Sequence, residues 1–229
     1  MTHRQDSERA FDDVASDYDG WYRIAIGREV DRLEKAVLYR LAEPLLGKVA
    51  LDVGTGTGHF AADLVSRGLA VMGVDISAPM LDVARSKGTG AALVLADAAL
   101  LPVADARFDL VLSVTALEFV ADRQRVLTEM WRALRPGGSL LVAVLNAWSP
   151  WAWHRRNESR RTVTPFSHAH FLGPYEFQHL LGQFGPVHWS SSVFFGPSGQ
   201  GLRWATALEA IGQRWLRLFG ALLVGVVRK

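Results

Sequence analysis

The stretch that decides the fold is Val49-Ala-Leu-Asp-Val-Gly54-Thr-Gly-Thr-Gly58-His-Phe-Ala61. Five residues typical of a buried strand lead into three glycines spaced two apart, and the residues that follow are typical of a helix. A glycine-rich turn between a strand and a helix lets a ligand come close to the backbone, because no Cβ atom stands in the way. The stretch therefore predicts a strand–turn–helix unit with a ligand at its turn.

The glycine spacing separates this turn from two other ligand-binding turns. A dinucleotide-binding turn has the pattern G-x-G-x-x-G. Here the order is acid-x-G-x-G-x-G, and His59 stands where the third glycine of a dinucleotide site would be. A Walker loop is excluded because no Gly-Lys-Ser/Thr follows. Such a turn can also simply connect two elements, so the later strands decide its meaning.

Further apolar runs predict the strands that follow. Asp75 ends the second strand, 21 residues after Gly54, where a carboxylate can accept both hydroxyls of a ribose. Asp97 follows the third strand. The predicted strands after the first are residues 70–74, 91–95, 108–113, 139–145, 187–195 and 219–227. Helical spacing predicts helices over residues 27–46, 122–134 and 202–218, with Pro44 near the end of the first.

This ordered set resembles the class I S-adenosylmethionine-dependent methyltransferases. More narrowly, it is similar to the small-molecule branch that includes the ubiquinone/menaquinone-biosynthesis methyltransferases. The matching motifs, within residues 11–146, are Leu51–Gly58, Gly73–Ser77 with Met80, Asp97 with Leu101-Pro102, Phe108–Val111 and Leu134–Gly138. The resemblance implies a Rossmann-like α/β fold. In that fold a seven-stranded, mostly parallel sheet carries helices on both faces, and an antiparallel last strand enters between the fifth and sixth.

The resemblance also implies that S-adenosylmethionine binds at the carboxyl ends of the first, second and fourth strands. Asp75 would then bind the ribose and Asp97 the adenine, while the glycine turn approaches the methionine part. The expected cofactor-binding residues are Tyr18, Asp52, Gly54, Thr55, Gly56, Asp75, Ile76, Met80, Asp97, Ala98, Ser113 and Val114. No metal ligand is expected. A competing interpretation is that the strand-end aspartates only cap helices.

A single methyltransferase domain over residues 1–229 is the simplest organisation for a chain of this length. Within it, residues 11–46 would form an N-terminal flap over the cofactor and a helix, with Tyr18 facing the cofactor. Residues 47–146 would form the cofactor-binding core, and residues 147–229 a substrate cover and the C-terminal strands. The flap segment can also be an amphipathic helix whose aromatic side chains only cover the core.

Methyl transfer from a sulfonium is an in-line displacement, so the protein mainly has to align the acceptor and exclude water. The catalytic residues are therefore unknown from sequence. Candidates for a general base are His154, His168, His170 and Glu118. Each of them is also explained as a surface or structural residue.

Residues 148–170 form the one long stretch without a clear period, and they combine three tryptophans with several arginines. Arg155 and Arg156 can hold an anionic group through forked hydrogen bonds. The hypothesis is a small-molecule acceptor, apolar or aromatic, that this segment closes over. Two alternatives stay open: a surface helix with solvated arginines, and transient contact of the same face with a membrane.

Composition limits the partners and the location. The chain has no cysteine, which excludes disulfides and thiolate chemistry. A net charge of +2 does not favour nucleic acid as a partner. The N-terminus has no apolar core of a signal peptide, and no uncharged apolar stretch reaches the roughly 18 residues that span a bilayer. A cytoplasmic protein without a stable membrane anchor is therefore expected, and its oligomeric state is left open.

Two other functions share much of this pattern. A nicotinamide-dependent oxidoreductase has the same kind of sheet and the ribose carboxylate, but His59 disfavours it because the third glycine serves close helix–strand packing. A non-catalytic S-adenosylmethionine-binding protein would keep the residues around Gly54 and Asp75. A DNA amino-methyltransferase is disfavoured, because its Asn/Asp-Pro-Pro-Tyr/Phe motif is missing after the fourth strand.

Overall fold

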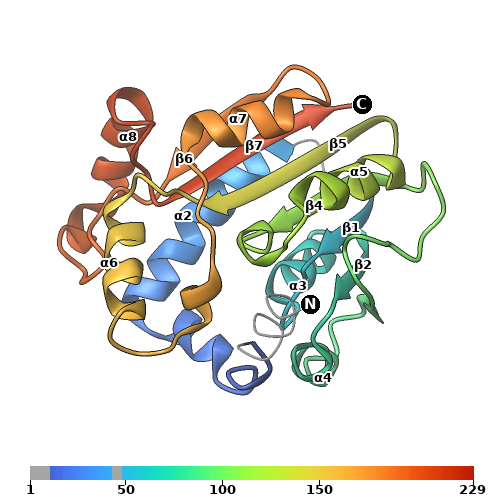
Figure 1. Cartoon of the computed structure of the whole chain (residues 1–229), viewed down its shortest axis with the longest axis horizontal. Helices are drawn as coiled ribbons and strands as arrows, with labels where there is room; N and C mark the ends of the chain where they lie inside the picture. The colour runs from blue at the N-terminus through green and yellow to red at the C-terminus, as the bar shows by residue number, and fades with distance from the viewer. Residues whose placement is uncertain (1–10, 43–47) are drawn as a thin grey trace.

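The structure is a computed structural model that describes residues 11–42 and 48–229. Their strands form one seven-stranded sheet in the order β3-β2-β1-β4-β5-β7-β6 (Figure 1). Only β7 runs antiparallel to its neighbours in this sheet, β5 and β6. The strands are β1 (Val49–Val53), β2 (Ala70–Asp75), β3 (Ala92–Leu95), β4 (Phe108–Val114), β5 (Leu134–Leu145), β6 (His188–Ser192) and β7 (Leu222–Arg228). The predicted fold class and the place of the last strand are confirmed.

Helices join the strands and cover both faces of the sheet (Figure 1). The α-helices are α2 (Ala25–Ala42), α3 (His59–Ser66), α4 (Ala78–Ser86), α5 (Arg123–Ala133), α6 (Pro150–Ser159), α7 (Pro174–Gly182) and α8 (Ala205–Trp215). Short 3-10 helices are η1 (Tyr18–Arg23), η2 (Leu117–Phe119), η3 (Pro165–His168) and η4 (Leu202–Trp204).

The core consists of two apolar layers, one on each face of the sheet. Successive side chains of a strand point to opposite faces. On β4, Leu110 and Leu112 pack in the layer that contains α2 and α3, whereas Val111 packs with α5 and α7. Because both faces are covered, the central strands are apolar almost throughout. The covered sheet therefore holds the carboxyl ends of β1, β2 and β4 in fixed positions.

The start of β5 differs from the sequence prediction. The sequence predicts a helix through Leu134, then a turn, then a strand over residues 139–145. In the structure Leu134 already pairs with Phe108 on β4, and the register shifts after that pair. Pro136 has no N–H to donate and Gly137 has a φ of +79°. The residues that the sequence indicates as a turn therefore form an irregular part of one long strand.

Helix boundaries differ at three places. The described part of α2 ends at Ala42, so the predicted role of Pro44 lies outside the described residues. The predicted C-terminal helix is η4 followed by α8. The stretch without a period contains α6, where the Ser149 hydroxyl caps the helix by accepting the Ala152 N–H at 3.1 Å. The sequence shows no clear helical spacing of apolar residues here, because the apolar Trp153 lies on the exposed side of α6.

Candidate active site

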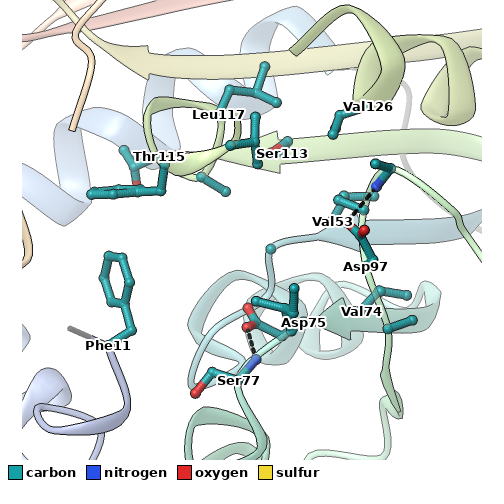
Figure 2. Close-up of a pocket in the computed structure, with 18 of the residues that line it drawn as sticks. Phe11, Val53, Val74, Asp75, Ser77, Asp97, Ser113, Thr115, Leu117 and Val126 are labelled. Carbon is teal, nitrogen blue, oxygen red and sulfur yellow. Dashed lines mark hydrogen bonds between the residues drawn. The ribbon is translucent and has the colours of Figure 1, made fainter. Parts of the chain in front are cut away.

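A cavity of about 340 Å³ opens at the carboxyl ends of β1, β2 and β4 (Figure 2). This is the place where strand order reverses, and where open α/β sheets bind ligands. Nine of the twelve predicted cofactor-binding residues line it: Tyr18, Gly54, Asp75, Ile76, Met80, Asp97, Ala98, Ser113 and Val114. The structure therefore brings together side chains from four strand ends and from the N-terminal segment, residues 11–23.

Three predicted residues, Asp52, Thr55 and Gly56, do not line the cavity. Asp52 is buried, and the Thr55 hydroxyl donates to its carboxylate at 2.7 Å. Burial raises the pKa of Asp52 to about 7. The Gly56 N–H donates to the carboxylate of Asp75 at 2.7 Å. The three residues thus support the glycine turn and Asp75, and their direct contact with a cofactor stays a prediction.

Gly54 is required by the geometry of the turn. Its φ is +77°, a conformation that L side chains rarely adopt, and a Cβ atom there would lie 2.4 Å from the Cβ of Ala116. Gly56 also has a positive φ, +54°, but a Cβ there would meet no protein atom within 4 Å. Gly54 therefore permits both the turn and the close approach of the loop after β4, which closes the floor of the cavity.

The carboxylate of Asp75 is held at the cavity wall by two backbone N–H groups. Gly56 donates at 2.7 Å and Ser77 at 2.9 Å, the latter drawn in Figure 2. Burial raises the pKa of Asp75 above its ordinary value. The N-cap of α4 is Ser77, whose hydroxyl accepts the Met80 N–H. Asp75 is therefore not the cap of this helix, and its carboxylate is available to a ligand.

Polar groups at the other wall complete a donor and acceptor set. Asp97 follows β3 and accepts the Ala99 N–H at 2.9 Å. Ser113 is fully buried, and its hydroxyl has no hydrogen-bond partner among the described residues. A buried unpaired hydroxyl is costly unless a ligand or water satisfies it. Together with the apolar side chains of Ile76 and Met80, this wall fits a ligand that combines a flat ring with hydroxyl and amine groups.

The N-terminal segment is fastened to the sheet side of the cavity. The Ser77 hydroxyl donates to Asp12 at 2.5 Å, and the Thr57 hydroxyl donates to Asp19 at 2.7 Å. Lys87 forms an ion pair with the same Asp19 at 2.5 Å. Figure 2 shows Phe11 and Asp97 at opposite ends of the cavity. The segment therefore contributes its aromatic side chains to the cavity rather than only to the core.

Aromatic rings continue from the cavity to the segment after α6. The rings of Phe11 and Phe119 lie 4.7 Å apart and nearly perpendicular, and Phe166 lies 6.2 Å beyond Phe119. The guanidinium of Arg155, on α6, lies 4.9 Å from the ring centre of Phe166. One of its nitrogens, Nη1, is buried without a hydrogen-bond partner among the described residues. Phe166 and Arg155 do not line the cavity themselves; they continue its apolar wall beyond Phe119 and add a cationic group there.

Ionisable groups surround the same region. Glu118 is 1% exposed; one carboxylate oxygen accepts the Leu145 N–H, and the other has no partner within the described residues. Burial raises the pKa of Glu118 to about 7 and that of Glu34 to about 8. Burial also raises the pKa of Tyr18 to about 12 and lowers that of Arg155. Such shifted groups are common in functional sites.

The predicted histidines lie elsewhere. None of His154, His168 and His170 is among the residues that line the cavity. His154 and His170 are exposed, and the imidazole of His170 lies 3.8 Å from a carboxylate oxygen of Glu176. Glu118 also does not line the cavity, but both residues beside it in the chain do.

Sequence reasoning missed the wall that follows β4. The lining residues not predicted include Phe11, Ser77, Thr115, Leu117, Phe119, Val120, Arg125 and Val126. Thr115 has a φ of +50°, a strained conformation that often marks a functional turn. One sequence signal could have indicated this wall: the apolar residues Leu117 and Phe119 on either side of Glu118, directly after a predicted strand.

Comparison with known proteins agrees with this site. Residues 51–142 match a family described as a methyltransferase domain. The chain is 34% identical over 174 residues to the demethylmenaquinone methyltransferase of Beutenbergia cavernae, a match that covers 74% of this chain and 71% of that protein. It is 33% identical over 147 residues to the malonyl-[acyl-carrier protein] O-methyltransferase of Serratia marcescens, which covers 64% of this chain and 55% of that protein.

A solved structure extends the likeness to nearly the whole chain. The S-adenosylmethionine-dependent methyltransferase of Thermotoga maritima, described as a possible histamine N-methyltransferase, superposes with a TM-score of 0.72. The match covers 97% of this chain and 99% of that one at 24% identity, so it shows the shared fold. The sheet order, the cavity and the similarity to the methyltransferase from Beutenbergia cavernae all agree. The chain belongs to the class I S-adenosylmethionine-dependent methyltransferases.

Proposed function

We propose that this methyltransferase acts on a small aromatic or otherwise apolar acceptor that carries an anionic or hydrogen-bond-accepting group. The observation that carries the proposal is Arg155, whose Nη1 is buried and unpaired among the described residues beside the ring of Phe166. A buried donor without a partner costs stability, and a guanidinium fork suits a carboxylate. An acceptor with an anionic group would give this nitrogen its partner.

The proposed cofactor contacts follow from the cavity wall. Asp75 accepts the ribose hydroxyls, and Ile76 and Met80 pack on the adenine. Asp97, with Ala98 beside it, accepts the adenine amine. The glycine turn and the end of β4 bind the methionine part. The residues proposed for that part are Asp52, Gly54, Thr55, Gly56, Ser113 and Val114, with Tyr18 covering the site.

When bound, S-adenosylmethionine would supply an electrophilic methyl group for in-line transfer to the acceptor's lone pair, with S-adenosylhomocysteine as the leaving group and the acceptor's proton lost to a base. The residues of this chain align the acceptor and exclude water. Phe11 and Phe119 supply the apolar enclosure. Glu118 is the candidate to take the proton, because both of its neighbours in the chain line the cavity and burial raises its pKa to about 7.

The names of the relatives do not point to one acceptor. Their names differ, one for demethylmenaquinone and the other for malonyl-[acyl-carrier protein], and the second match covers only about half of that relative. The acceptor proposal therefore rests on Arg155 and the rings near it. Exclusion of nucleic acid and a cytoplasmic location stay predictions from composition.

The experiment compares Arg155→Gln with Arg156→Gln, an exposed arginine on the same helix. Affinity for S-adenosylhomocysteine is measured by calorimetry, and labelled methyl transfer is measured to 3,4-dihydroxybenzoate and to uncharged catechol. We expect Arg155→Gln to keep the affinity and to raise KM for the carboxylate roughly tenfold or more, the usual loss of a charge-assisted hydrogen bond. KM for catechol should stay unchanged, and Arg156→Gln should match the wild type.

Two outcomes contradict the proposal. If Arg155→Gln lowers cofactor affinity and methyl transfer in parallel, α6 belongs to the structural core and not to an acceptor site. If the wild-type enzyme methylates neither aromatic compound but does methylate an aliphatic amine, the acceptor class is wrong.

A further inference from the structure

Helix α8 contacts the core mainly through small side chains and leaves several large apolar ones exposed. Its buried residues are Ala205, Glu209 and Gly212. A Cβ atom on Gly212 would lie 2.2 Å from Cγ of Phe194, so the backbone of the helix rests directly on that ring. Trp204, the residue just before the helix, and Trp215, its last residue, are 59% and 72% exposed. The small residues face inward and the large indoles face solvent.

The exposed large apolar residues between positions 204 and 219 form a group that we call the α8 face. It consists of Trp204, Ile211, Trp215, Leu216 and Phe219, all exposed. Ile211 and Trp215 are four residues apart, so they lie on one side of α8, and Trp204 directly precedes the helix. The last two belong to the turn that leads to β7. Contiguous exposed apolar patches mark interaction sites more often than single exposed residues do.

The exposed charges within residues 202–219 are all positive. The guanidinium groups of Arg203 and Arg214 lie 5.5 and 5.4 Å from the ring centres of Trp204 and Trp215. In the described part of the chain, no carboxylate lies within 4.0 Å of these two arginines or of Arg217. The one acid between residues 202 and 219 is Glu209.

Glu209 does not offset this charge at the surface. It is buried, and its carboxylate accepts the Val193 N–H at 2.9 Å and the Gln213 amide at 2.8 Å. The exposed charges of residues 202–219 are therefore arginines alone. The α8 face is thus complementary to a negatively charged, partly apolar surface.

Helix α6 extends the same surface. Its Trp151 packs in one apolar cluster with Ala205 at the start of α8. Both helices lie at the same end of the molecule (Figure 1). Trp153 of α6 is exposed, as are Arg160 and Arg161 just after it. Exposed aromatic and basic residues therefore occur on both adjoining elements, beside one exposed acid of α6, Glu158.

We infer that the α8 face docks on the surface of an anionic phospholipid membrane. Indole rings are favoured at the boundary between lipid and water, and arginines bind anionic head groups. The described residues include no helix of the length and hydropathy needed to cross a bilayer, so the contact is made in the plane of the surface. A second copy of the chain is disfavoured, because a symmetric contact would bring the same arginines together.

The test uses the intact protein and vesicles in a flotation assay. The probes are vesicles of phosphatidylcholine alone and of phosphatidylcholine with one third phosphatidylglycerol. We expect binding only to the anionic vesicles, with a loss of roughly tenfold or more in Trp204→Ser/Trp215→Ser. Replacing Arg203, Arg214 and Arg217 by Gln should weaken binding roughly fivefold for each arginine near the surface. Leu95→Ser/Leu100→Ser is the matched control, since both leucines are exposed away from these arginines.

The outcomes separate the possible occupants. Unchanged affinity for S-adenosylhomocysteine in every variant shows that the fold and the cofactor site survive. The inference is overturned if the wild type does not float with anionic vesicles, or if the leucine control loses binding equally. It is also overturned if the protein is a dimer in solution that the tryptophan variants convert to a monomer, because the α8 face then binds a second copy.

Discussion

The two proposed halves of the site, one for the cofactor and one for the acceptor, are built in different ways. In the cofactor half, Asp75 is held by backbone N–H groups of Gly56 and Ser77, within one strand–turn–helix neighbourhood. In the acceptor half, Phe11, Arg155 and other side chains meet from segments far apart in the chain. Any sequence that forms the turn supplies the backbone N–H groups. Contacts between side chains from distant segments, in contrast, are lost when any one of those residues changes. The difference implies that acceptor specificity can change while cofactor binding is retained.

The strongest test of the backbone-built half is Gly54→Ala. The left-handed φ costs about 1–2 kcal/mol for a residue with a Cβ, and the contact with Ala116 adds about 1–3 kcal/mol. We expect the free energy of unfolding to fall by roughly 2–5 kcal/mol in urea titration. Gly56→Ala should lose only about 1–2 kcal/mol, because a Cβ there meets no protein atom within 4 Å. Equal losses would mean that the approach of Ala116 does not matter.

The second test concerns cofactor binding itself. Asp75→Ala should weaken binding of S-adenosylhomocysteine by roughly 1.5–3 kcal/mol, the range for hydrogen bonds to a charged group, with the fold retained. Calorimetry gives the affinity, and Asp82→Ala on the exposed side of α4 is the control. Wild-type affinity in Asp75→Ala would remove this aspartate from the cofactor site.

The buried carboxyl group of Glu118 should make the stability of the protein depend on pH. The pKa of Glu118 is raised from 4.5 to about 7, so the folded state favours its protonated form. Its contribution to stability is fully present below pH 4.5 and is lost as pH rises through about 7. Between pH 5 and 8.5 the free energy of unfolding of the wild type, measured in urea, should therefore fall by roughly 2 kcal/mol more than that of Glu118→Gln. Glu158→Gln, an exposed glutamate on α6, should follow the wild type; the same behaviour in Glu118→Gln would contradict the raised pKa.

The smallest expected effect concerns the N-terminal segment that joins the two halves. Thr57→Val removes the hydroxyl that donates to Asp19, a loss of about 0.5–1.5 kcal/mol. Hydrogen exchange of residues 12–21 should become faster in this variant and slower with S-adenosylhomocysteine. Thr128→Val removes an exposed hydroxyl–carbonyl bond on α5 and should leave these residues unchanged. Identical exchange with and without ligand in the wild type would show that the segment does not respond to the cofactor.

The cofactor half could be predicted from the sequence because its determinants are local. The alternation of strands and helices predicts a mostly parallel sheet, and the family resemblance supplies the place of its last strand. Asp75 and Asp97 come directly after strands whose carboxyl ends meet. Side chains at those ends must face the same cavity. Gly54 follows from the turn itself. The exact partners of Asp75 were beyond sequence reasoning, since backbone N–H directions depend on φ and ψ values.

The acceptor half could not be predicted, because it depends on which side each helix turns inward. Outside the site, the apolar spacing of residues 202–218 correctly indicates a helix, but not that Ile211 and Trp215 face solvent while Leu208 packs on the core. Gly212 decides this, since its missing side chain lets the other side of α8 lie against Phe194. Similarly, the burial of Arg155 depends on Phe166, which follows α6 after a loop.

The N-terminal segment has a consequence for the order of binding. Its aspartates are fastened beside the cofactor wall through Ser77 and Thr57, while the ring of Phe11 packs on Phe119 in the acceptor half. Ordering this segment costs conformational entropy, and that cost falls only on the first ligand to bind. Cofactor and acceptor should therefore bind with positive cooperativity, and each must tighten the other by the same factor.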